Sequence, residues 1–474
     1  MIILGTNSVK AAGGFNVANS CRFNRADSPN FTRTPSSASN RRTWTWSGWV
    51  KRSGLGNIQT LFNGSNSNFP EIFYFDADDK FLYHNDIAGA DYKLISSQVF
   101  RDVSAWYHIV VAKDTTQSTE TNRLKVYVNG SQIIMNESAL GYPAQNFEGG
   151  ININDVHIIG NWKTNSYYID GYLAEIAFVD GSQLAPDQFG EFDEDSGIWK
   201  PIDVSGLTFG TNGFYLDFKD SSALGNDVSG NNNDYTPNNL TAIDQSTDTC
   251  TNNFATWNLL DNFYQSNTYS EGNLQVQTQS TSFTYNSATI GVSTGKWYWE
   301  VEYDAKSGGT DQPMIGITST QPTANDNELG NFPNDFAWYT DNGTGYLSNN
   351  NTYSNVGFNA YTVGDVISIA LDLDNNKLYF AKNGTWEKSG NPESGSTGTG
   401  AISITSTAST PLGAYFPSVG DATNSQNATF KTNFGSPPYA ISSGNADGNG
   451  FGNFEYAVPS GYFALNTKNL AEYG

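Results

Sequence analysis

Cysteine and methionine are scarce in this sequence, and no cysteine-based architecture is compatible with it. Only 2 cysteines, Cys21 and Cys250, occur among the 474 residues. That number excludes a disulfide framework and a cysteine metal site. We expect both thiols to be reduced and structural, and a single bridge between them is the alternative.

Basic residues are also few. The chain has 24 Lys and Arg against 47 Asp and Glu, which gives a formal net charge of -23. Such a charge repels phosphate backbones and anionic membranes, so we expect no nucleic-acid partner. Solubility accounts for the acidity in the simplest interpretation. Specific Ca²⁺ binding is the alternative, and we expect no other cofactor.

Long apolar runs are absent. No stretch approaches the roughly 20 residues that span a bilayer, and the apolar start at Met1 is too short for the core of a signal peptide. We therefore expect neither membrane insertion nor Sec export. For a binding protein this favours assembly in a bacterial host cytoplasm and release by lysis, as for a virion component.

Aromatic residues and glycine are abundant instead. Phe, Tyr and Trp make up 14% of the chain, and 47 glycines separate short segments. This mixture favours strands and tight turns. Thr43 to Lys51 alternates large aromatic and small polar residues, so the pattern predicts a strand with Trp44 and Trp46 on one buried face. Asn129-Gly130 then predicts a two-residue hairpin turn.

The second half repeats this order. Lys296 to Tyr303 and Val366 to Leu371 read as buried strands, and Asn383-Gly384 supplies a second hairpin turn. The spacing from Trp44 to Asn129 nearly equals that from Trp297 to Asn383. We therefore predict an all-β protein with two concanavalin-like antiparallel β-sandwich (jelly-roll) domains in tandem.

Domain boundaries follow from composition, because 474 residues exceed what one hydrophobic core serves. The Gly-, Asn- and Asp-rich stretch from Leu224 to Tyr235 looks too polar to hold a core and indicates a connector. The residues just before it read either as a strand of the first sandwich or as a short further unit. We expect the tail to dock onto another subunit. The predicted division is 1–205 (first sandwich), 206–267 (polar connector, or completion of the first sandwich), 268–437 (second sandwich) and 438–474 (tail).

Several motifs of the first half resemble laminin-G-like, concanavalin-type lectin domains. They are Phe31-Thr-Arg, Trp44-Thr-Trp-Ser-Gly-Trp-Val-Lys, Trp106-Tyr-His-Ile-Val-Val, Val126-Tyr-Val-Asn-Gly and Ile169-Asp-Gly-Tyr-Leu-Ala-Glu-Ile-Ala-Phe. The second half is similar to a SPRY domain through Gly295-Lys-Trp-Tyr-Trp-Glu-Val-Glu, Ile315-Gly-Ile, Val363-Gly-Asp-Val-Ile-Ser-Ile-Ala-Leu-Asp and Leu378-Tyr-Phe-Ala-Lys-Asn-Gly. Both resemblances imply a β-sandwich that binds through its loops.

Three further phrases accompany the pairing of these domains: Arg22-Phe-Asn-Arg, Arg41-Arg-Thr-Trp-Thr-Trp and Pro459-Ser-Gly-Tyr-Phe-Ala-Leu-Asn-Thr. The combination is similar to structural and tail-fibre-like proteins of marine and cyanobacterial phages. It implies a virion protein that binds a host surface glycan or protein, contacts other virion proteins and forms a homo-oligomer. A capsid or tail decoration protein with virion contacts alone is the alternative.

An enzyme is disfavoured, because no nucleophile elbow, phosphate loop or catalytic triad signature occurs. Jelly-roll glycoside hydrolases use paired carboxylates, and Glu300, Glu302 and Asp304 alternate along one predicted strand. We interpret them as its polar outer face, with a polysaccharide-degrading enzyme as the remaining alternative.

Metal binding has equally weak support. Two acidic clusters, Asp76 to Asp79 and Asp372 to Asn375, lack the spacing of a calcium loop and predict hairpin turns. His84, His108 and His157 show no ligand spacing.

Aromatic residues beside polar turns are the candidate ligand contacts, because such rings stack on sugars or anchor protein interfaces. The predicted ligand-binding residues are Trp162, Tyr167, Tyr168, Trp338, Tyr339, Tyr346 and Trp386. No catalytic and no metal-binding residue is predicted.

Overall fold

The alternating segment that begins at Thr43 forms a long strand in the computed structural model, which describes residues 14–64, 71–87, 90–137, 140–162, 166–309 and 312–474. In this strand, β3 (Thr43–Arg52), Trp44 and Trp46 point into the core. Their rings pack against Phe73, with centroids 6.5 and 5.1 Å away. The other face of β3 is also buried, because Trp49 belongs to a separate cluster with Trp106 and Trp199.

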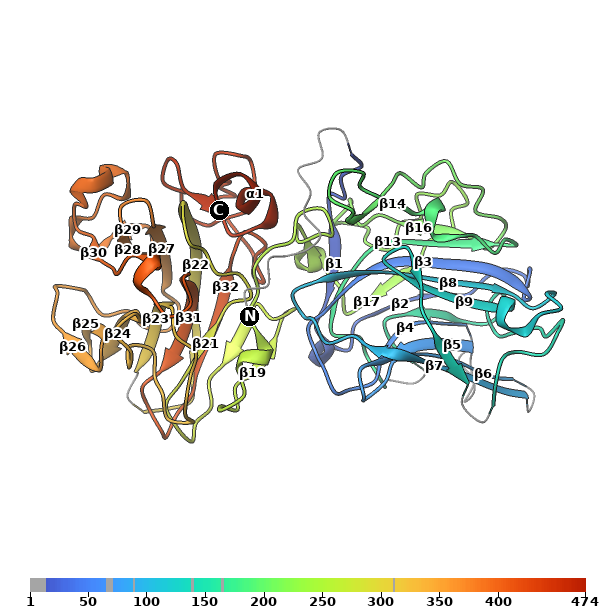
Figure 1. Cartoon of the computed structure of the whole chain (residues 1–474), viewed down its shortest axis with the longest axis horizontal. Coiled ribbons are helices and arrows are strands. Elements are labelled where there is room, and N and C mark those ends of the chain that lie inside the picture. The colour runs from blue at the N-terminus through green and yellow to red at the C-terminus, as the bar shows by residue number, and fades with distance from the viewer. Residues whose placement is uncertain (1–13, 65–70, 88–89, 138–139, 163–165, 310–311) are drawn as a thin grey trace. The chain divides into compact units, whose positions relative to one another are not determined.

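Two antiparallel sheets enclose this core, and Figure 1 shows them as two layers. The first sheet contains β10 (Ser131–Gln132), β9 (Leu124–Val128), β8 (Trp106–Asp114), β3, β13 (Gly171–Asp180), β1 (Ser20–Phe23) and β18 (Gln245–Ser246), and β16 (Phe214–Leu216) pairs with β13. The second sheet contains β11 (Met135–Glu137), β7 (Ala90–Val99), β6 (Lys80–Ile87), β5 (Glu71–Phe75), β4 (Gln59–Gly64), β12 (His157–Ile159), β2 (Asn30–Arg33) and β17 (Thr236–Asn238). A small hairpin joins β14 (Gly190–Phe192) to β15 (Trp199–Pro201).

The first unit extends to Asn252, further than its aromatic strands suggest. Strands β16, β17 and β18 all come from the segment considered as a connector, and they pair with β13, β2 and β1. Within it, Leu224 and Tyr235 are buried in the main core, each 3% exposed. The buried Asp227 makes this possible, because its carboxylate accepts hydrogen bonds from the backbone N–H groups of Tyr215, Ser229 and Asn233.

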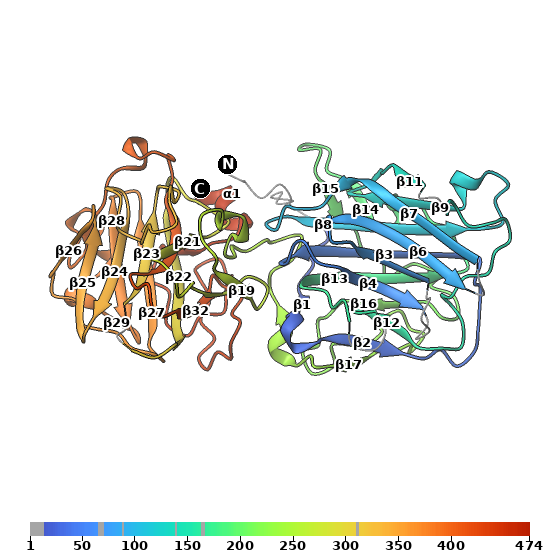
Figure 2. The same ribbon diagram turned by 90° about the horizontal axis from the view of Figure 1, so that it is seen from below.

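The second unit comprises Asn253–Gly474 and is also built from two sheets. The third sheet contains β19 (Thr268–Ser270), β20 (Gln275–Gln277), β32 (Ala428–Asn433), β22 (Lys296–Lys306), β27 (Val366–Asp372), β28 (Lys377–Lys382) and β29 (Thr385–Trp386), and β30 (Ile402–Ser403) and β33 (Phe463–Ala464) pair with β28 and β22. The fourth sheet contains β21 (Thr284–Ser287), β31 (Phe416–Asp421), β23 (Pro313–Thr318), β24 (Phe336–Asp341), β25 (Thr344–Asn349) and β26 (Thr352–Ser354). Figure 2 shows β23 to β26 side by side.

Both predicted hairpin turns are present. Asn129 and Gly130 have φ of 48° and 78°, and Asn383 and Gly384 have φ of 49° and 78°. In each turn the flanking residues pair across the hairpin, as Val128 does with Ser131. The prediction of two antiparallel β-sandwiches is therefore confirmed. The α-helix α1 (Thr467–Tyr473) is short, and none of the helices in the described ranges has the length and apolar character to cross a membrane.

Both cysteines are free thiols in the first unit. Cys21 and Cys250 are buried and form no disulfide bond with each other. Burial raises the pKa of each thiol well above its usual value. The two side chains are therefore protonated packing residues with little thiolate reactivity.

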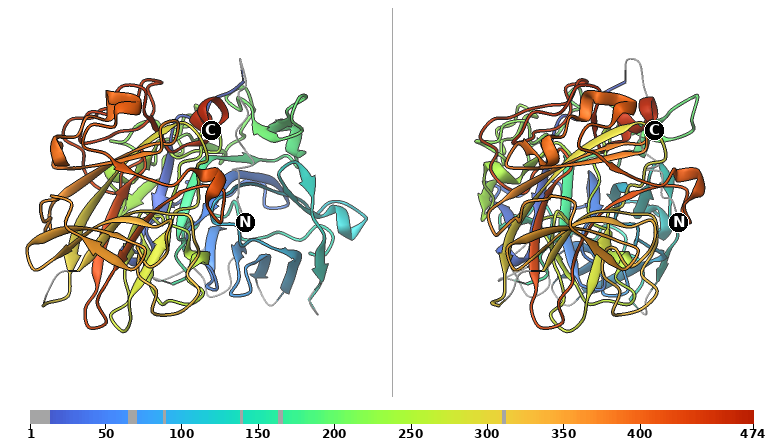
Figure 3. Two further views of the ribbon diagram at one scale, coloured as in Figure 1. Left: turned by 60° about the vertical axis from the view of Figure 1, so that its left-hand side comes forward. Right: turned by 90° about the vertical axis from the view of Figure 1, so that its left-hand side faces the viewer.

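The C-terminal tail packs onto its own sandwich, in contrast to the expected docking on another subunit. Strand β33 pairs in parallel with β22, and Phe454 and Tyr462 are buried beside Tyr298 and Tyr379. Figure 3 gives two further views of the ribbon diagram, in which the tail is dark red. The two rings of the tail are therefore used to cover the third sheet.

Glu300 fastens this tail. Its buried carboxylate accepts hydrogen bonds from the backbone N–H groups of Glu455 and Tyr456, at 2.9 and 2.8 Å, and from Tyr298 and Asn433. Burial raises the pKa of Glu300 despite these donors. Glu300 does lie on the face of β22 opposite the core residues Trp299 and Val301, but this outer face is not exposed at Glu300, because the tail covers it and uses the carboxylate as its anchor.

We predict that Glu300→Ala lowers the free energy of unfolding by roughly 2 to 4 kcal/mol, because it strands several buried donors. Urea unfolding of the full-length protein, followed by tryptophan fluorescence, measures the loss. Glu302→Ala on the same strand is the control: Glu302 is only partly buried, and its truncation should cost less than about 1 kcal/mol. Equal losses in the two variants would contradict the anchoring role.

Candidate functional site

The outer face of the fourth sheet carries the candidate site. Strand alternation places Trp338 and Leu347 in the core of the second unit, so their neighbours Tyr339 and Tyr346 face outward. These two tyrosines stand directly opposite each other on β24 and β25. Small side chains share this outer face, such as Ser348, which pairs with Ala337. Large rings beside small residues leave a hollow on the sheet.

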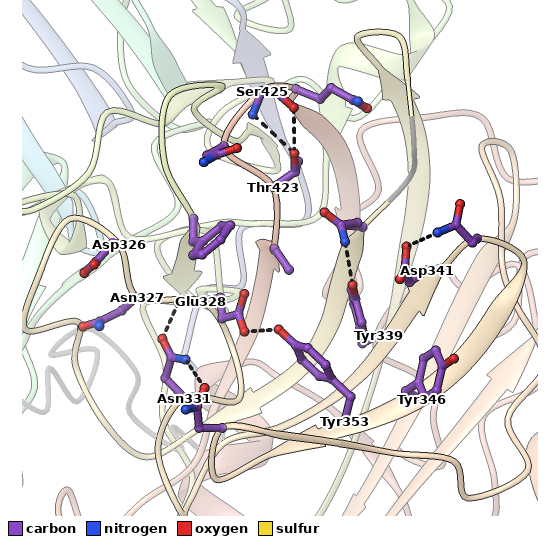
Figure 4. Close-up of a pocket in the computed structure, with 17 residues that line it drawn as sticks. Asp326, Asn327, Glu328, Asn331, Tyr339, Asp341, Tyr346, Tyr353, Thr423 and Ser425 are labelled. Atoms are coloured by element: carbon purple, nitrogen blue, oxygen red, sulfur yellow. Dashed lines mark hydrogen bonds between the residues drawn. The ribbon is translucent and has the colours of Figure 1, made fainter.

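A pocket of about 1200 Å³ occupies this hollow (Figure 4). Loops before β24 and after β31 complete its walls. Its lining residues are Phe283, Gln312, Asp326, Asn327, Glu328, Asn331, Tyr339, Asp341, Asn342, Tyr346, Asn351, Tyr353, Ala422, Thr423, Asn424, Ser425 and Gln426. Hydroxyl, amide and carboxylate groups dominate this lining, so it suits a polar ligand with many hydrogen-bonding groups and not an apolar one.

Three tyrosine rings form one side of the pocket. The ring of Tyr339 lies 4.6 Å from that of Tyr353 and 6.0 Å from that of Tyr346, with interplanar angles of 33° and 34°. Gln312 donates a hydrogen bond of 2.8 Å to the hydroxyl oxygen of Tyr339. Burial raises the pKa of Tyr339 and of Tyr353 above the usual phenol value. Both hydroxyls are therefore protonated and can donate hydrogen bonds at neutral pH.

Carboxylates supply the other prominent groups. Glu328 is 5% exposed and accepts a hydrogen bond from the hydroxyl of Tyr353, as Figure 4 shows. Burial raises the pKa of Glu328, and the bond from Tyr353 opposes that shift. Asp341 is half-buried and Asp326 is exposed. No Lys, Arg or His belongs to the described lining.

Asp335 holds the loop that carries Glu328 and Asn331. Its buried carboxylate accepts hydrogen bonds from the backbone N–H groups of Gly330 and Phe332, at 3.3 and 3.2 Å, and from the hydroxyl of Thr318 at 2.6 Å. Burial raises the pKa of Asp335 to about 6, although these donors lower it. Asp335 is thus a positioning residue beneath the pocket wall.

The predicted aromatic residues of the second half divide between core and site. Tyr339 and Tyr346 line the pocket. Trp338 does not, because it is completely buried and donates its indole N–H to the backbone oxygen of Asn359. Trp386 is half-buried and packs edge-on against Tyr379, with ring centroids 6.4 Å apart, beneath the tail.

The aromatic candidates of the first half form a small stacked group. Trp162 lies between Tyr74 and Tyr167, with centroid distances of 6.2 and 5.3 Å. Tyr167 is 38% exposed, whereas Tyr168 is 7% exposed and belongs to the interior. Trp162 and Tyr167 therefore present a ring surface on the first sandwich, outside the pocket of the second.

A second pocket of about 520 Å³ lies beside β2 and β17 of the first unit. Arg33 lines it, but this guanidinium already donates to the backbone oxygen of Asn212 and to the side-chain oxygen of Asn233. These contacts hold the Asn-rich loop against the sandwich. The chemistry available to a ligand is consequently poorer than in the larger pocket.

The acidic clusters serve turns and ion pairs. Asp76 accepts hydrogen bonds from the backbone of Asp78 and Lys80, and Asp79 pairs with Arg52 and Arg101, each at 3.0 Å. Guanidinium groups therefore occupy the positions where a cation would compete.

The second acidic cluster is used in the same way. Asp372 pairs with Lys296 at 3.1 Å and accepts a hydrogen bond from the backbone of Asn375. Its carboxylate is therefore committed to the turn that follows β27.

The histidines differ from one another. His108 is buried between Ser47 and Trp199, and burial lowers its pKa to about 3, so it is a neutral core group as expected. Within the described ranges, His84, Asp86 and Asp91 are the group of three side chains close enough to share a metal ion. His84 Nε2 and Asp91 Oδ1 already lie within hydrogen-bond distance of each other there, at 2.7 Å.

Sequence reasoning missed Tyr353 and Glu328. Tyr353 follows the turn at Asn350 and Asn351, whose positive φ values of 50° and 55° start the hairpin from β25 to β26. The paired asparagines are a usable hairpin signal. Glu328 lies in a loop without periodicity, and nothing in the local sequence distinguishes it from an ordinary surface acid.

Family comparisons agree with this architecture. Residues 27–187 match the model described as the concanavalin A-like lectin/glucanases superfamily, and residues 296–436 match the SPRY domain model. The chain carries a concanavalin A-like domain followed by a SPRY domain. The pocket lies in the SPRY domain, and the tail that Glu300 fastens begins after the matched region.

Solved structures similar to the chain share little sequence with it. The SPRY domain of human HERC1 is 19% identical, with a TM-score of 0.26, over 33% of this chain and 86% of that one. The heptameric SAP-like pentraxin from Limulus polyphemus is 16% identical, with a TM-score of 0.27, over 37% and 82%. The TRIM65 PSpry domain is 13% identical, with a TM-score of 0.27, over 37% and 88%. No match was found among curated proteins.

We predict that Asp335 makes the SPRY domain more stable in mild acid. Its folded-state pKa of about 6 lies above the usual Asp value, so its stabilising contribution is complete below the unfolded pKa and is lost as pH rises through about 6. The free energy of unfolding should therefore be larger at pH 5 than at pH 7. Asp335→Asn should reduce that difference by on the order of 1 kcal/mol.

Urea unfolding of the full-length protein at both pH values tests this. Asp261, whose pKa burial also raises to about 6, should leave part of the pH dependence in the Asp335→Asn variant. An unchanged difference between pH 5 and pH 7 in that variant would show that Asp335 titrates with its ordinary pKa.

Proposed function

We propose that this chain is a binding subunit of a bacteriophage particle, tail-fibre-like or adhesin-like, and that the SPRY pocket holds a glycan of the host surface. The observation that carries the proposal is the composition of the pocket. Three tyrosine rings stand beside amide, hydroxyl and carboxylate groups in one hollow of about 1200 Å³. Sugars present hydroxyl edges and apolar ring faces, which these two kinds of group complement.

Size and openness of the site also favour an extended polar ligand. The pocket is bounded by the outer face of a sheet and by loops, so a chain of sugar residues can leave it without crossing the core. The phenol hydroxyl of Tyr339 is a donor, since its oxygen accepts from Gln312 and its own proton is left for a ligand, and the oxygen atoms of Glu328 and Asp341 are acceptors. Sugar hydroxyls accept from the first kind and donate to the second.

A place in a virion explains how a polar site of modest affinity can be sufficient for attachment to a cell. Repetition of the chain in a homo-oligomer, held by other virion proteins, raises the effective concentration of sites at a cell surface. Modest affinity per pocket then gives firm attachment. In this proposal the chain is assembled in the host cytoplasm and acts in the released particle as a binder without catalytic activity.

A carbohydrate-binding assay tests the pocket. We expect the full-length protein to bind members of an array of bacterial surface polysaccharides, and Tyr346→Ala to weaken the strongest interaction at least about tenfold, since a stacking ring is lost. Isothermal titration calorimetry measures the change. Tyr346 is half-buried, so the variant should still fold, and its melting curve checks that it does.

Tyr167→Ala on the concanavalin A-like domain is the matched control, because it removes an exposed tyrosine from the other candidate surface. Its affinity should equal that of the wild type. A loss confined to Tyr167→Ala would move the site to the first domain, and the absence of binding to every polysaccharide would refute the glycan proposal.

Antibody labelling of intact phage particles tests the location. We expect label on tail fibres or at the tail tip, where a host-binding subunit acts. Preimmune serum on the same particles controls for unspecific label. A uniform distribution of label over the head would contradict attachment and would support a decoration protein. If the particles carry no label and an immunoblot finds no copy of the chain in them, a virion role is excluded.

A further inference from the structure

The charge of the SPRY pocket restricts its ligand. Glu328, Asp326 and Asp341 line it, and no basic side chain does among the described lining residues. The net charge of -23 for the whole chain adds to a negative potential that raises the local concentration of cations. An acidic sugar would have to approach these carboxylates without a counter-charge. The lining therefore selects against uronic and sialic acids.

The arrangement of the pocket carboxylates favours an organic cation over a metal ion as the ligand. Within the described ranges, a set of three His, Cys, Asp or Glu ligand atoms within 4.8 Å of one another occurs at His84, Asp86 and Asp91 of the first domain. The three pocket carboxylates do not form such a set. They are spread around the hollow, a geometry that suits a charged group on a larger molecule better than a bare ion.

The tyrosine rings provide a second attraction for a cation. Tyr339, Tyr346 and Tyr353 gather on one wall, in which Tyr339 is 3% and Tyr353 is 45% exposed. The face of an exposed tyrosine ring attracts an ammonium group within about 6 Å. Glu328 stands at the hydroxyl end of Tyr353, and only one of its oxygens accepts a hydrogen bond from a described residue. Aromatic faces and an incompletely bonded, nearly buried carboxylate thus meet in the same hollow.

A neutral sugar would not balance the negative charge of the pocket carboxylates. Binding covers the carboxylates and removes water from them, and burying an ionised carboxylate costs several kcal/mol unless an opposite charge or several donors replace the water. Hydroxyl donors replace part of that loss, whereas an ammonium group supplies both the charge and up to three donors. The lining is therefore best matched by a ligand with a positive charge.

We infer that the glycan bound in the SPRY pocket carries an ammonium group, as in an amino sugar with a free amine, which the pocket carboxylates and tyrosine rings recognise together. This inference rests on the proposed function and specifies the class of sugar. The ammonium group lies beside Glu328, Asp341 adds negative charge from another part of the hollow, and the sugar ring packs on the tyrosine wall.

Two tetrasaccharides that differ only at nitrogen test the inference. Full-length protein is titrated with a tetramer of glucosamine and with a tetramer of N-acetylglucosamine. We expect the free-amine tetramer to bind at least tenfold more tightly at low salt, and its affinity to fall as the KCl concentration rises. Equal affinity, or a preference for the acetylated tetramer, would overturn the inference.

Asp341→Asn removes one charge from the half-buried rim of the pocket while preserving shape. It should reduce the preference for the free-amine tetramer over the acetylated tetramer at least threefold, because only the free-amine tetramer loses an opposite charge. Asp187→Asn, an exposed acid of the first domain, is the matched control and should change neither affinity. Equal effects of the two variants would mean that net charge alone attracts the amine, which contradicts recognition in the pocket.

The source of the ammonium group and the proposed function are tested separately. Choline binding that depends on Asp341 and Tyr346, without binding of the glucosamine tetramer, would keep ammonium recognition and identify a quaternary ammonium substituent of the glycan as its source. If neither probe binds, ammonium recognition is wrong. Binding to array polysaccharides that still depends on Tyr346 would then leave the glycan proposal intact.

Discussion

Burial of tryptophan and phenylalanine side chains between paired sheets determines which way the remaining residues of each strand face. In the second unit, Trp338 occupies the core with no exposed surface. Because successive side chains of a strand point to opposite faces, this forces Tyr339 outward. The paired strand repeats the arrangement with Leu347 inward and Tyr346 outward. The tyrosine wall of the pocket is thus a geometric consequence of the core packing behind it.

Buried carboxylates organise the polar segments that strand packing cannot hold. Asp227 collects backbone donors from an Asn- and Gly-rich loop, Glu300 from the C-terminal tail, and Asp335 from the loop beneath the pocket. Each carboxylate exchanges water for several N–H donors, which makes its burial tolerable. Segments without apolar periodicity can consequently belong to the folded domains, as the placement of Leu224 and Tyr235 in the first core demonstrates.

Strands with a regular alternation of residues can be predicted from this sequence. Segments that are held by a buried carboxylate cannot. Alternation and Asn-Gly turns predict both sandwiches, since the period of two is a local property. The same period could have separated Trp338 from Tyr339, because adjacent residues of a strand cannot both face the ligand. The place of Glu328 could not be predicted, because its loop is positioned by Asp335 and its side chain is oriented by Tyr353 from a different strand. For the same reason the sequence left open whether residues 206–252 connect the domains or complete the first sandwich, and the packing of the tail onto its own domain was not predicted.

The acids of the SPRY domain fall into two kinds according to how many donors they face. Glu300 accepts four hydrogen bonds and Asp335 accepts three, so neither has capacity to spare for a ligand. Glu328 is almost as buried as these two, yet a single hydroxyl donates to it among the described residues. Burial of a carboxylate with so few donors costs free energy, because the lost water is not replaced, and the packing of the surrounding strands and loops offsets that cost. The difference in donor count separates acids that build the fold from an acid that is left for another molecule to complete.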